Sequence, residues 1–335
     1  MRTTRLLALA AATSMVVLSA CGTTGSGSDP AQQQEAKPVS EVKIGFAQRQ
    51  MDAPFYAAME AMAQQRAQED GFELLFQNAG GDPVTQLNQV QAMLSQGVDA
   101  LVINAISPET QRTQLEQAAG EVPVLFVDTG VPEVGLTAVQ SDNHEIGRLS
   151  GLLTAKRLGQ GAGVQVAILN GGPNDEIVGP ARQEGFLAGL AEGGVTAEVV
   201  ASATATYTQE EAVPATESML AAHPDTDLVL GLNDAMALGA LSVLRNQGNT
   251  TTLVAAASDG QKEALAEISE GGCTGQYVST GLNSPSIAAD QVFDIAVGVA
   301  TGEIDPATVE PTSLTQAAGI GCENVGEFYN PESIF

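Results

Sequence analysis

The amino-acid sequence predicts an α/β fold made of two similar lobes, each a doubly wound parallel sheet covered by helices. Short apolar runs, which suit strands buried on both faces, alternate along the chain with stretches whose apolar residues recur at helical spacing. After the glycine-rich residues 159–163 this pattern begins again. A repeat of roughly 120 residues favours a duplicated lobe over one very large sheet or a solenoid.

The first half of the chain is expected to alternate strands and helices. Pro54 is well placed near the start of a helix, which Asp70-Gly71 ends, and Asp142-Asn143 caps a later helix. The expected strands lie at residues 42–47, 72–76, 98–103, 122–127 and 138–141. The expected helices lie at residues 54–69, 108–119 and about 143–158, with one more that carries Leu87, Val90 and Leu94 and ends at Gly97.

The second half repeats the alternation. Strands are expected at residues 164–169, 195–201, 228–232 and 253–257, and helices around Arg182, Phe186 and Leu190, from about 209 to 223, from 235 to the stop at Gly248, and over 262–269. Asp234 is a good N-cap for the third of these helices. Asn233 would then stand at the carboxyl end of a buried parallel strand, where open α/β sheets bind ligands.

Five of the apolar runs end in Asn or Asp. These residues are Asn104, Asp128, Asn170, Asn233 and Asp259. Turn or cap chemistry could explain each one separately. Together they predict a crevice lined with hydrogen-bonding groups.

The charge of the chain excludes some partners. The 335 residues hold 13 basic and 40 acidic side chains, a formal net charge of −27. Nucleic acid and anionic lipid are therefore not expected to bind, because little positive charge is available to neutralise phosphate. The acidity itself is interpreted as solubility or a salty habitat.

The N-terminus has the pattern of an export signal. Arg2 and Arg5 precede a short apolar stretch at residues 6–17, and Leu18-Ser19-Ala20-Cys21 resembles a bacterial lipobox. The resemblance implies a signal peptide at 1–20, cleavage before Cys21, lipidation of that thiol and anchoring outside the cytoplasm. An ordinary secretory signal is the alternative. Residues 21–40, rich in Gly, Ser, Thr, Gln and Pro, are expected to form a flexible tether.

Two further cysteines remain once Cys21 is lipidated. Cys273 and Cys322 would lie outside the cytoplasm, where disulfides persist, so we expect them to pair. Two buried free thiols are the alternative.

Common catalytic and metal-binding patterns are not found in the sequence. There is no Gly-x-x-x-x-Gly-Lys phosphate loop and no Gly-x-Ser-x-Gly elbow, and residues 159–163 precede a strand instead of following one, unlike a dinucleotide fingerprint. His144 and His223 are the only histidines and lie far apart in sequence. We expect no catalytic residue, no metal site, no cofactor and no enzymatic activity.

Several motifs in order along residues 41–335 resemble the type I periplasmic sugar-binding proteins of ABC importers, the group similar to ribose-binding proteins. They are Pro54-Phe55-Tyr56, Gly97-Val98-Asp99-Ala100-Leu101-Val102-Ile103-Asn104, Val127-Asp128, Ser141-Asp142-Asn143, Arg182-x-Glu184-Gly185-Phe186, Ala222-His223-Pro224-Asp225, Asn233-Asp234-x-Met236-Ala237-Leu238-Gly239-Ala240 and Asp259-Gly260.

The resemblance implies two lobes joined by a hinge of three crossings, near Asp142, Ser279 and Thr312. The N-terminal lobe would comprise residues 41–142 plus 280–311, and the C-terminal lobe 143–279 plus 312–335. A monomer would close over a monosaccharide or related polyol and deliver it to a membrane permease and its ATPase.

The resemblance also implies the binding residues. Phe55, Tyr56 and Tyr207 match positions that stack on sugar faces, with ordinary core packing as the alternative. Five residues match polar ligand contacts, for which Asn, Asp and Arg side chains suit sugar hydroxyls. They are Asn104, Asp128, Arg182, Asn233 and Asp259.

Three positions depart from the ribose-type pattern. Ala53, Thr129 and Ser279 stand where Asn, Arg and Gln are common, which puts ribose itself in doubt. Ser279 is kept as the candidate contact near the hinge. Arg49 and Asp52, in the loop after the first strand, are expected to replace the missing donor and acceptor.

The leading hypothesis is thus a lipid-anchored binding protein that captures a sugar by hinge closure. A sensory subunit that presents a sugar or small signal molecule to a membrane receptor is the alternative. A nucleoside or other small signalling molecule stays open as the ligand. A sugar-responsive repressor is excluded, because a signal and a tether occupy the place where its basic DNA-binding helices would lie.

Overall fold

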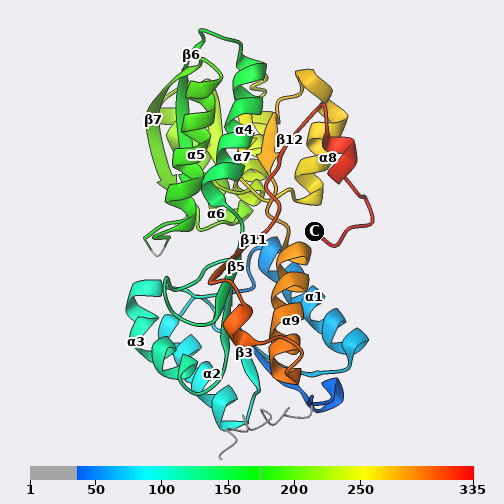
Figure 1. The fold of residues 1–335 in the computed structure, drawn as a ribbon. Coiled ribbons are helices and arrows are strands. Elements are labelled where there is room, and N and C mark those ends of the chain that lie inside the picture. The colour runs from blue at the N-terminus through cyan, green and yellow to red at the C-terminus, as the bar shows by residue number, and fades with distance from the viewer. Residues whose placement is uncertain (1–35, 174) are drawn as a thin grey trace, which may run out of the picture. The chain divides into compact units, whose positions relative to one another are not determined.

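The computed structural model describes residues 36–173 and 175–335 (Figure 1). The predicted signal peptide, the lipidation site Cys21 and most of the predicted tether lie outside the described residues. Residues 36–335 form one compact unit, which contains two parallel sheets with helices between their strands. The predicted fold class of two α/β lobes is confirmed.

The first lobe is built on a six-stranded parallel sheet in the order β11-β5-β4-β3-β1-β2. Its strands are β1 (Lys43–Gln48), β2 (Glu73–Asn78), β3 (Ala100–Ile103), β4 (Val124–Val127), β5 (Thr137–Gln140) and β11 (Thr312–Leu314). Its helices are α1 (Pro54–Asp70), α2 (Pro83–Ser95), α3 (Pro108–Ala119) and α9 (Pro285–Thr301), with short 3-10 turns at Val39–Glu41 and Pro306–Thr308.

Alternate residues of the central strands pack on opposite faces of this sheet. Val102 joins the core beneath α1 and α9, whereas Leu101 and Ile103 join the core beneath α2 and α3. Because side chains alternate along a strand, a continuous apolar run is what a sheet covered on both faces requires. The apolar runs of the sequence therefore predicted the central strands within a few residues.

The second lobe contains a four-stranded parallel sheet in the order β7-β6-β8-β9. Its strands are β6 (Gly163–Asn170), β7 (Thr196–Thr204), β8 (Leu228–Gly231) and β9 (Leu253–Ala256). Its helices are α4 (Asn143–Leu158), α5 (Val178–Glu192), α6 (Gln209–Ala222), α7 (Asp234–Asn246), α8 (Lys262–Gly271) and α10 (Val325–Phe328), with a 3-10 turn at Gly272–Thr274.

Helices α4 and α5 pack closely because glycines face each other across their contact. A Cβ on Gly151 would lie 2.2 Å from the backbone oxygen of Phe186, and one on Gly185 would lie 2.0 Å from that of His144. Neither distance is possible for a real side chain. The glycines thus set the approach of the two helices, and α5 carries Arg182 into the region between the lobes.

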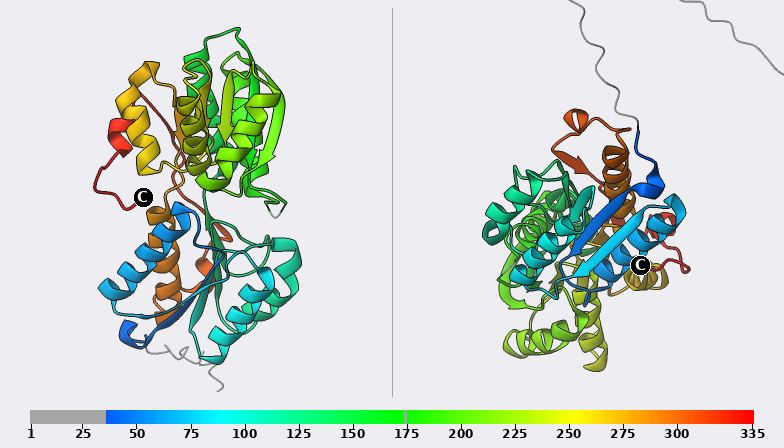
Figure 2. Two further views of the ribbon diagram at one scale, coloured as in Figure 1. Left: turned by 180° about the vertical axis from the view of Figure 1, so that it is seen from behind. Right: turned by 90° about the horizontal axis from the view of Figure 1, so that it is seen from below.

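A third, two-stranded sheet joins β10 (Ser279–Gly281) and β12 (Gly319–Gly321) in antiparallel fashion. Both strands contact α4. The chain leaves the second lobe after β10, forms α9 and β11 in the first lobe, and returns at β12 (Figure 2).

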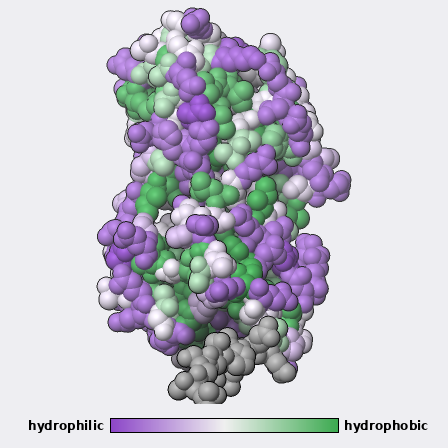
Figure 3. Space-filling model, viewed as in Figure 1, coloured by the Kyte–Doolittle hydropathy of each residue, from purple (hydrophilic) through white to green (hydrophobic). Residues whose placement is uncertain are grey.

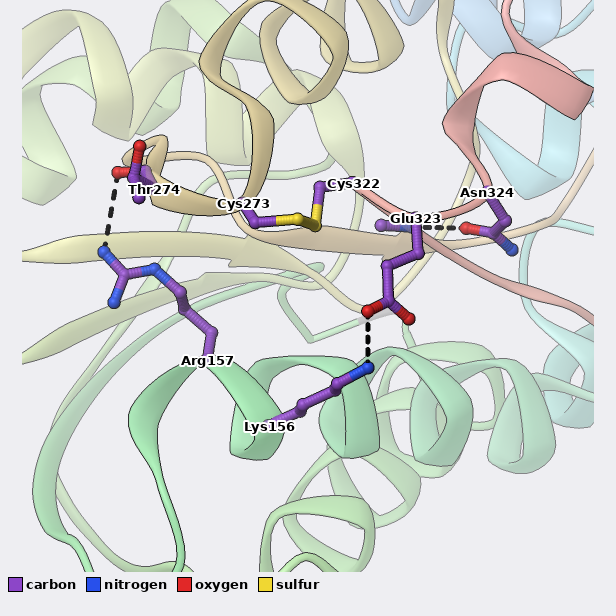
Figure 4. Close-up of a disulfide and its surroundings, with 8 residues drawn as sticks. Lys156, Arg157, Cys273, Thr274, Cys322, Glu323 and Asn324 are labelled. Carbon is purple, nitrogen blue, oxygen red and sulfur yellow. Dashed lines mark hydrogen bonds and ion pairs between the residues drawn. A yellow bond between two sulfur atoms is a disulfide. The ribbon is translucent and has the colours of Figure 1, made fainter.

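Cys273 and Cys322 form a disulfide beside this sheet, with their Cα atoms 5.1 Å apart (Figure 4). The predicted pairing is confirmed. The bond closes a loop that spans 49 residues and contains both β10 and β12. It therefore fixes, within the second lobe, the departing and the returning crossing relative to each other.

The strands that flank the crossings suggest slightly different lobe limits from those predicted. β11, which begins at Thr312, pairs with β5 of the first sheet, and β10 packs on α4 and β9 of the second lobe. We therefore propose crossings at residues 141–142, 282–284 and 315–318. Hydrogen bonds link the three crossings. Ser141 of the first crossing donates from Oγ to Oδ1 of Asn283 in the second at 2.8 Å, and its Oγ lies 2.9 Å from Oγ1 of Thr315 in the third.

The N-cap of α7 also differs from the prediction. Asn233, not Asp234, is the cap, and its Oδ1 accepts from the backbone N–H of Met236 at 3.0 Å. Asp234 is the first helical residue, and its carboxylate serves the neighbouring loop instead.

The surface of one face is mixed in character. In Figure 3 hydrophobic and hydrophilic residues are interspersed on both lobes. The large exposed apolar side chains are distributed over separate elements: Val84, Ile177, Val199, Ile287, Leu314 and Ile334. Among the helices of residues 36–173 and 175–335, none combines the length and the apolar composition that a membrane span requires.

Candidate functional site

A cavity lies between the two lobes, at the carboxyl ends of their strands. Open α/β sheets bind ligands at this edge. Both lobes contribute to its lining: Arg49, Ala53, Phe55, Tyr56, Asp128, Thr129, Asp175, Val178, Arg182, Tyr207, Asn233, Asp259 and Asn283.

The first-lobe wall combines a cation with two aromatic rings. Arg49 follows β1, and Phe55 and Tyr56 stand in the first turn of α1, which Pro54 begins. The Arg49 guanidinium lies 5.8 Å from the Tyr56 ring centroid, within the range of a cation–π contact. The two rings meet edge to face, with centroids 5.6 Å apart.

Arg49 has spare hydrogen-bonding capacity. Its Nη1 donates a long bond of 3.4 Å to Thr129 Oγ1, and its buried Nε has no partner among the described residues. A buried N–H without a partner is costly, so a ligand that accepts from this nitrogen would remove the cost.

Asp128 forms the polar end of the first-lobe wall, and Asn104 supports it from behind. Asp128 lies just past β4 with φ at 63°, a left-handed conformation that Asp tolerates better than most residues. Asn104 Nδ2 donates to Asp128 Oδ2 at 3.5 Å, and the buried Asn104 Oδ1 has no partner among the described residues. Asn104 lies directly behind Asp128, one residue removed from the lining.

Arg182 is the most connected residue of the second-lobe wall. Its Nε donates to Asn143 Oδ1 at 2.8 Å, and its Nη1 donates to the backbone oxygen of Leu232 at 3.2 Å. Nη1 also lies 3.7 Å from Asp259 Oδ1, and the guanidinium lies 5.9 Å from the Tyr207 ring. These contacts hold the guanidinium in one orientation.

Asp259 is held by its neighbours in a strained backbone conformation, with φ at 149°. Ser258 Oγ donates to its Oδ1 at 2.9 Å, and Asn283 Nδ2 donates to the same oxygen at 3.5 Å. Directly after it, the backbone N–H groups of Gly260 and Gln261 donate to Asp234 Oδ2 at 2.7 and 2.6 Å.

Asn233 and Tyr207 complete this wall. Asn233 Nδ2 donates to the backbone oxygen of Tyr207 at 3.2 Å, while its Oδ1 caps α7. The Tyr207 hydroxyl donates to Asp175 Oδ2 at 2.5 Å. The Tyr207 ring is thus held at its hydroxyl, and one face of the ring lies against the Arg182 guanidinium.

Burial and ion pairing shift the pKa values of the charged groups in opposite directions. Burial raises the pKa of Asp128 and of Asp259, and Arg182 opposes the rise in both. Burial by itself would lower the pKa of Arg182, but the charges of Asp259 and other neighbours raise it overall. The lining holds the cations of Arg49 and Arg182 beside carboxyl groups of Asp128, Asp175 and Asp259, so no excess of positive charge awaits an anion.

The structure brings most of the residues predicted from the sequence into one place. Eight of them line the cavity: Arg49, Phe55, Tyr56, Asp128, Arg182, Tyr207, Asn233 and Asp259. Asp52 is exposed and is not part of the lining, because the loop directs it to solvent. Ser279 is fully buried and bonds Ser150 and Thr154 of α4, so its hydroxyl is already used.

Sequence reasoning missed Asn283, Asp175 and Val178. Asn283 follows the short strand β10 and precedes the cap Ser284 of α9, the same strand-to-helix position as the other polar residues. That signal could have located it instead of Ser279. Asp175 and Val178 lie near the start of α5 and carry no comparable pattern. The described residues contain no cluster of His, Cys, Asp and Glu that could hold a metal ion.

Comparisons with known proteins agree with this geometry. The family described as periplasmic binding protein domain matches residues 44–304. The ribose import binding protein of Bacillus subtilis is 31% identical over 244 residues, which are 71% of this chain and 77% of that protein. A xylitol-binding protein of Mycolicibacterium smegmatis is 27% identical over 332 residues, covering 96% of this chain and 89% of that protein.

A solved structure has the same architecture. The ABC transporter solute-binding protein from Mycobacterium smegmatis, crystallised with bound glycerol, is 32% identical in sequence and superposes with a TM-score of 0.79, covering 88% of this chain and 99% of that chain.

Proposed function

The chain belongs to the periplasmic binding protein domain family, and from this premise we propose that it captures a neutral monosaccharide or polyol between its two lobes for an ABC importer. The ligand would contact both lobes only when they are close, so binding shifts the population toward the closed form. The relatives named for ribose and xylitol, and the similar solved structure with bound glycerol, support this class of ligand.

The observation that carries the proposal is the pairing of charges in the cavity. Arg49 and Arg182 each face carboxyl groups, and the aromatic rings of Phe55, Tyr56 and Tyr207 lie beside them. Hydroxyl groups both donate and accept, so they can bind carboxylates and guanidinium groups together. A phosphate or carboxylate ligand would meet Asp128, Asp175 and Asp259 and be repelled.

The remaining parts of the proposal concern location and partners. We propose that the chain is exported, cleaved before Cys21 and anchored by lipid on that residue, with residues 21–40 as a tether. It would act as a monomer without catalytic activity and transfer its ligand to a permease with an ATPase. The similarity to an ABC transporter solute-binding protein supports the importer as partner, and the residues Leu18-Ser19-Ala20-Cys21 support the lipid anchor.

The test is thermal unfolding of residues 36–335 against pentoses, hexoses, deoxysugars, inositols, linear polyols and nucleosides. Ligand at about a thousand times its Kd adds roughly 4 kcal/mol of stability, or on the order of 10 °C in Tm. A shift with one sugar or polyol would support the proposal and name the ligand. A shift only with nucleosides would overturn the ligand class.

The matched control is a pair of arginine variants. At the same ligand concentration, Arg182→Ala should reduce the ligand-dependent shift by about one third to two thirds, because a 10–150-fold higher Kd leaves roughly 1.2–2.7 kcal/mol of the stabilisation. Arg245→Ala, which removes an exposed arginine paired with Glu267, should leave the shift unchanged. An undiminished shift in Arg182→Ala would mean that the ligand binds elsewhere.

A further inference from the structure

The segment after α10 connects the two lobes without being one of the three crossings. Helix α10 packs on α8 of the second lobe, and Val325 belongs to the second-lobe core. The chain then runs toward the first lobe, and its end lies at the level where the lobes meet in the views of Figures 1 and 2. We call residues 329–335 the tail.

One end of the tail is bonded to the second lobe. The backbone N–H of Tyr329 donates to Val325 O at 2.8 Å, and Lys262 Nζ of α8 donates to Ser333 O at 2.6 Å. Ser333 also accepts, through Oγ, the backbone N–H of Phe335 at 3.2 Å. Hydrogen bonds thus hold the tail in place up to its last residue.

The other end of the tail packs on the first lobe. The Phe335 ring meets the Phe55 ring edge to face, with centroids 5.8 Å apart and an interplanar angle of 80°. Phe335 is only 9% exposed and belongs to the first-lobe core cluster that contains Tyr56 and Met59. By contrast, its neighbour Ile334 is 60% exposed.

The two anchors are too close in sequence to follow a large movement of the lobes. Ser333 and Phe335 are two residues apart, and two residues of extended chain span at most about 7 Å. When the lobes separate further than this slack, either the Lys262–Ser333 bond or the Phe335–Phe55 contact must break. The two contacts can therefore coexist only while the lobes are about as close as they are in this structure.

We propose that Phe335 is an inter-lobe latch and a positioning residue: it stabilises the closed form and holds the cavity-lining Phe55 ring in place. Its role in ligand binding rests on the function proposed above, whereas its role in lobe closure does not. Phe335 is not part of the lining, so it acts on the ligand through Phe55. A ligand would leave more slowly from a protein in which the latch is intact.

The first test measures ligand binding by the full chain. Phe335→Ala is expected to raise Kd about tenfold, mainly through a faster dissociation rate, because an edge-to-face aromatic contact and its buried area are lost. Phe335→Leu should recover part of the affinity. Ile334→Ala is the matched control and should bind as the unchanged protein does.

A second variant separates the latch from simple packing of Phe335. Lys262→Met removes the bond to Ser333 but leaves every first-lobe contact in place. Like Phe335→Ala, it should raise the dissociation rate of the ligand. Its effect on that rate should be smaller when Phe335→Ala is already present, because both substitutions weaken the same latch. Full additivity of the two effects would overturn the latch.

The third measurement needs no ligand. Spin labels at Val84 of the first lobe and Val199 of the second, both exposed, report the distribution of inter-lobe distances. Phe335→Ala should move this distribution toward longer distances in the unliganded protein. An unchanged distribution in a protein that binds ligand with unchanged kinetics would overturn the proposal. If no sugar or polyol binds the unchanged protein, the proposed function fails, and the distance measurement still tests the latch.

Discussion

The two walls of the cavity differ in how completely their polar groups are bonded. In the second lobe, Arg182 and Asp259 are tied to Asn143, Leu232, Ser258 and Asn283. In the first-lobe lining, the buried Arg49 Nε has no partner among the described residues. Outside the lining, Asn104 Oδ1 of the first lobe and Gln261 Oε1 of the second also have none. The second wall is pre-organised for a ligand, whereas the first wall leaves bonds for the ligand to complete. We infer that the second wall supplies rigidity and the first selects among sugars.

The second wall also receives covalent support, and removing it should have the largest effect on stability. Cys273→Ser with Cys322→Ser opens a loop of 49 residues, and the chain-entropy model predicts a loss of about 4 kcal/mol. Denaturant unfolding measures the change. Reduction of the unchanged protein is the control and should lower stability equally. A loss below about 1 kcal/mol would mean that the second lobe owes its rigidity to packing alone.

Arg182→Ala should weaken ligand binding by roughly 10–150-fold. The charge-assisted hydrogen bonds that it removes contribute about 1.5–3 kcal/mol, which corresponds to that change in affinity. It should also destabilise the unliganded protein, because Asp259 would lose the cation 3.7 Å away and stay buried. Titration calorimetry and thermal unfolding measure the two effects. A loss under threefold in affinity would remove Arg182 from the site.

A buried carboxyl group beneath the second wall should make stability depend on pH. Burial, reinforced by the charge of Asp259, raises the pKa of Asp234 to about 7. A raised pKa in the folded state means that the folded protein holds this proton more tightly. The contribution is complete below the ordinary Asp range near pH 4 and is lost as the pH rises through about 7.

A comparison of variants can measure this contribution. Between pH 5 and 6, its partial loss lowers the free energy of unfolding by about 1.4 kcal/mol. Asp234→Asn should flatten that slope, measured by denaturant unfolding at several pH values. Asp227→Asn, at an exposed bond to the backbone of Gln165, is the control. An unaltered slope in Asp234→Asn would assign the titration to another group.

The same contrast between walls explains which parts of the site the sequence could predict. Strand ends are local features, so apolar runs followed by Asn or Asp indicated three residues that line the cavity: Asp128, Asn233 and Asp259. Ser279 does not line it, because β10 packs on α4 and the Ser279 hydroxyl bonds Ser150 and Thr154. Asn283, four residues further on, takes the position in the lining.

Long-range contacts were beyond the sequence. Asp175 enters the lining by bonding the Tyr207 hydroxyl from a loop 32 residues away. The contact of Phe335 with Phe55 joins opposite ends of the folded chain. The predicted role of Asp234 as a cap was wrong because two backbone N–H groups of the next strand's loop compete for its carboxylate. Such competition depends on tertiary packing and leaves no periodic signal.

Arg49 provides the most sensitive test of the contrast, with the smallest expected effect. If the first wall is incomplete without ligand, Arg49→Ala should weaken binding about tenfold. It should destabilise the unliganded protein less than Arg182→Ala does, because the loss of the contacts with Tyr56 and Asp128 is partly offset by the removal of a buried unpaired N–H. Arg112→Ala, on α3 of the same lobe, is the matched control.

The same variants test selectivity between sugars. The ratio of the affinities for two sugars that differ at one hydroxyl should change more in Arg49→Ala than in Arg182→Ala, because the first wall has the unpaired group that would bond a ligand hydroxyl. An unchanged affinity would remove Arg49 from the site, and a large loss of stability without ligand would show that the first wall is as pre-organised as the second.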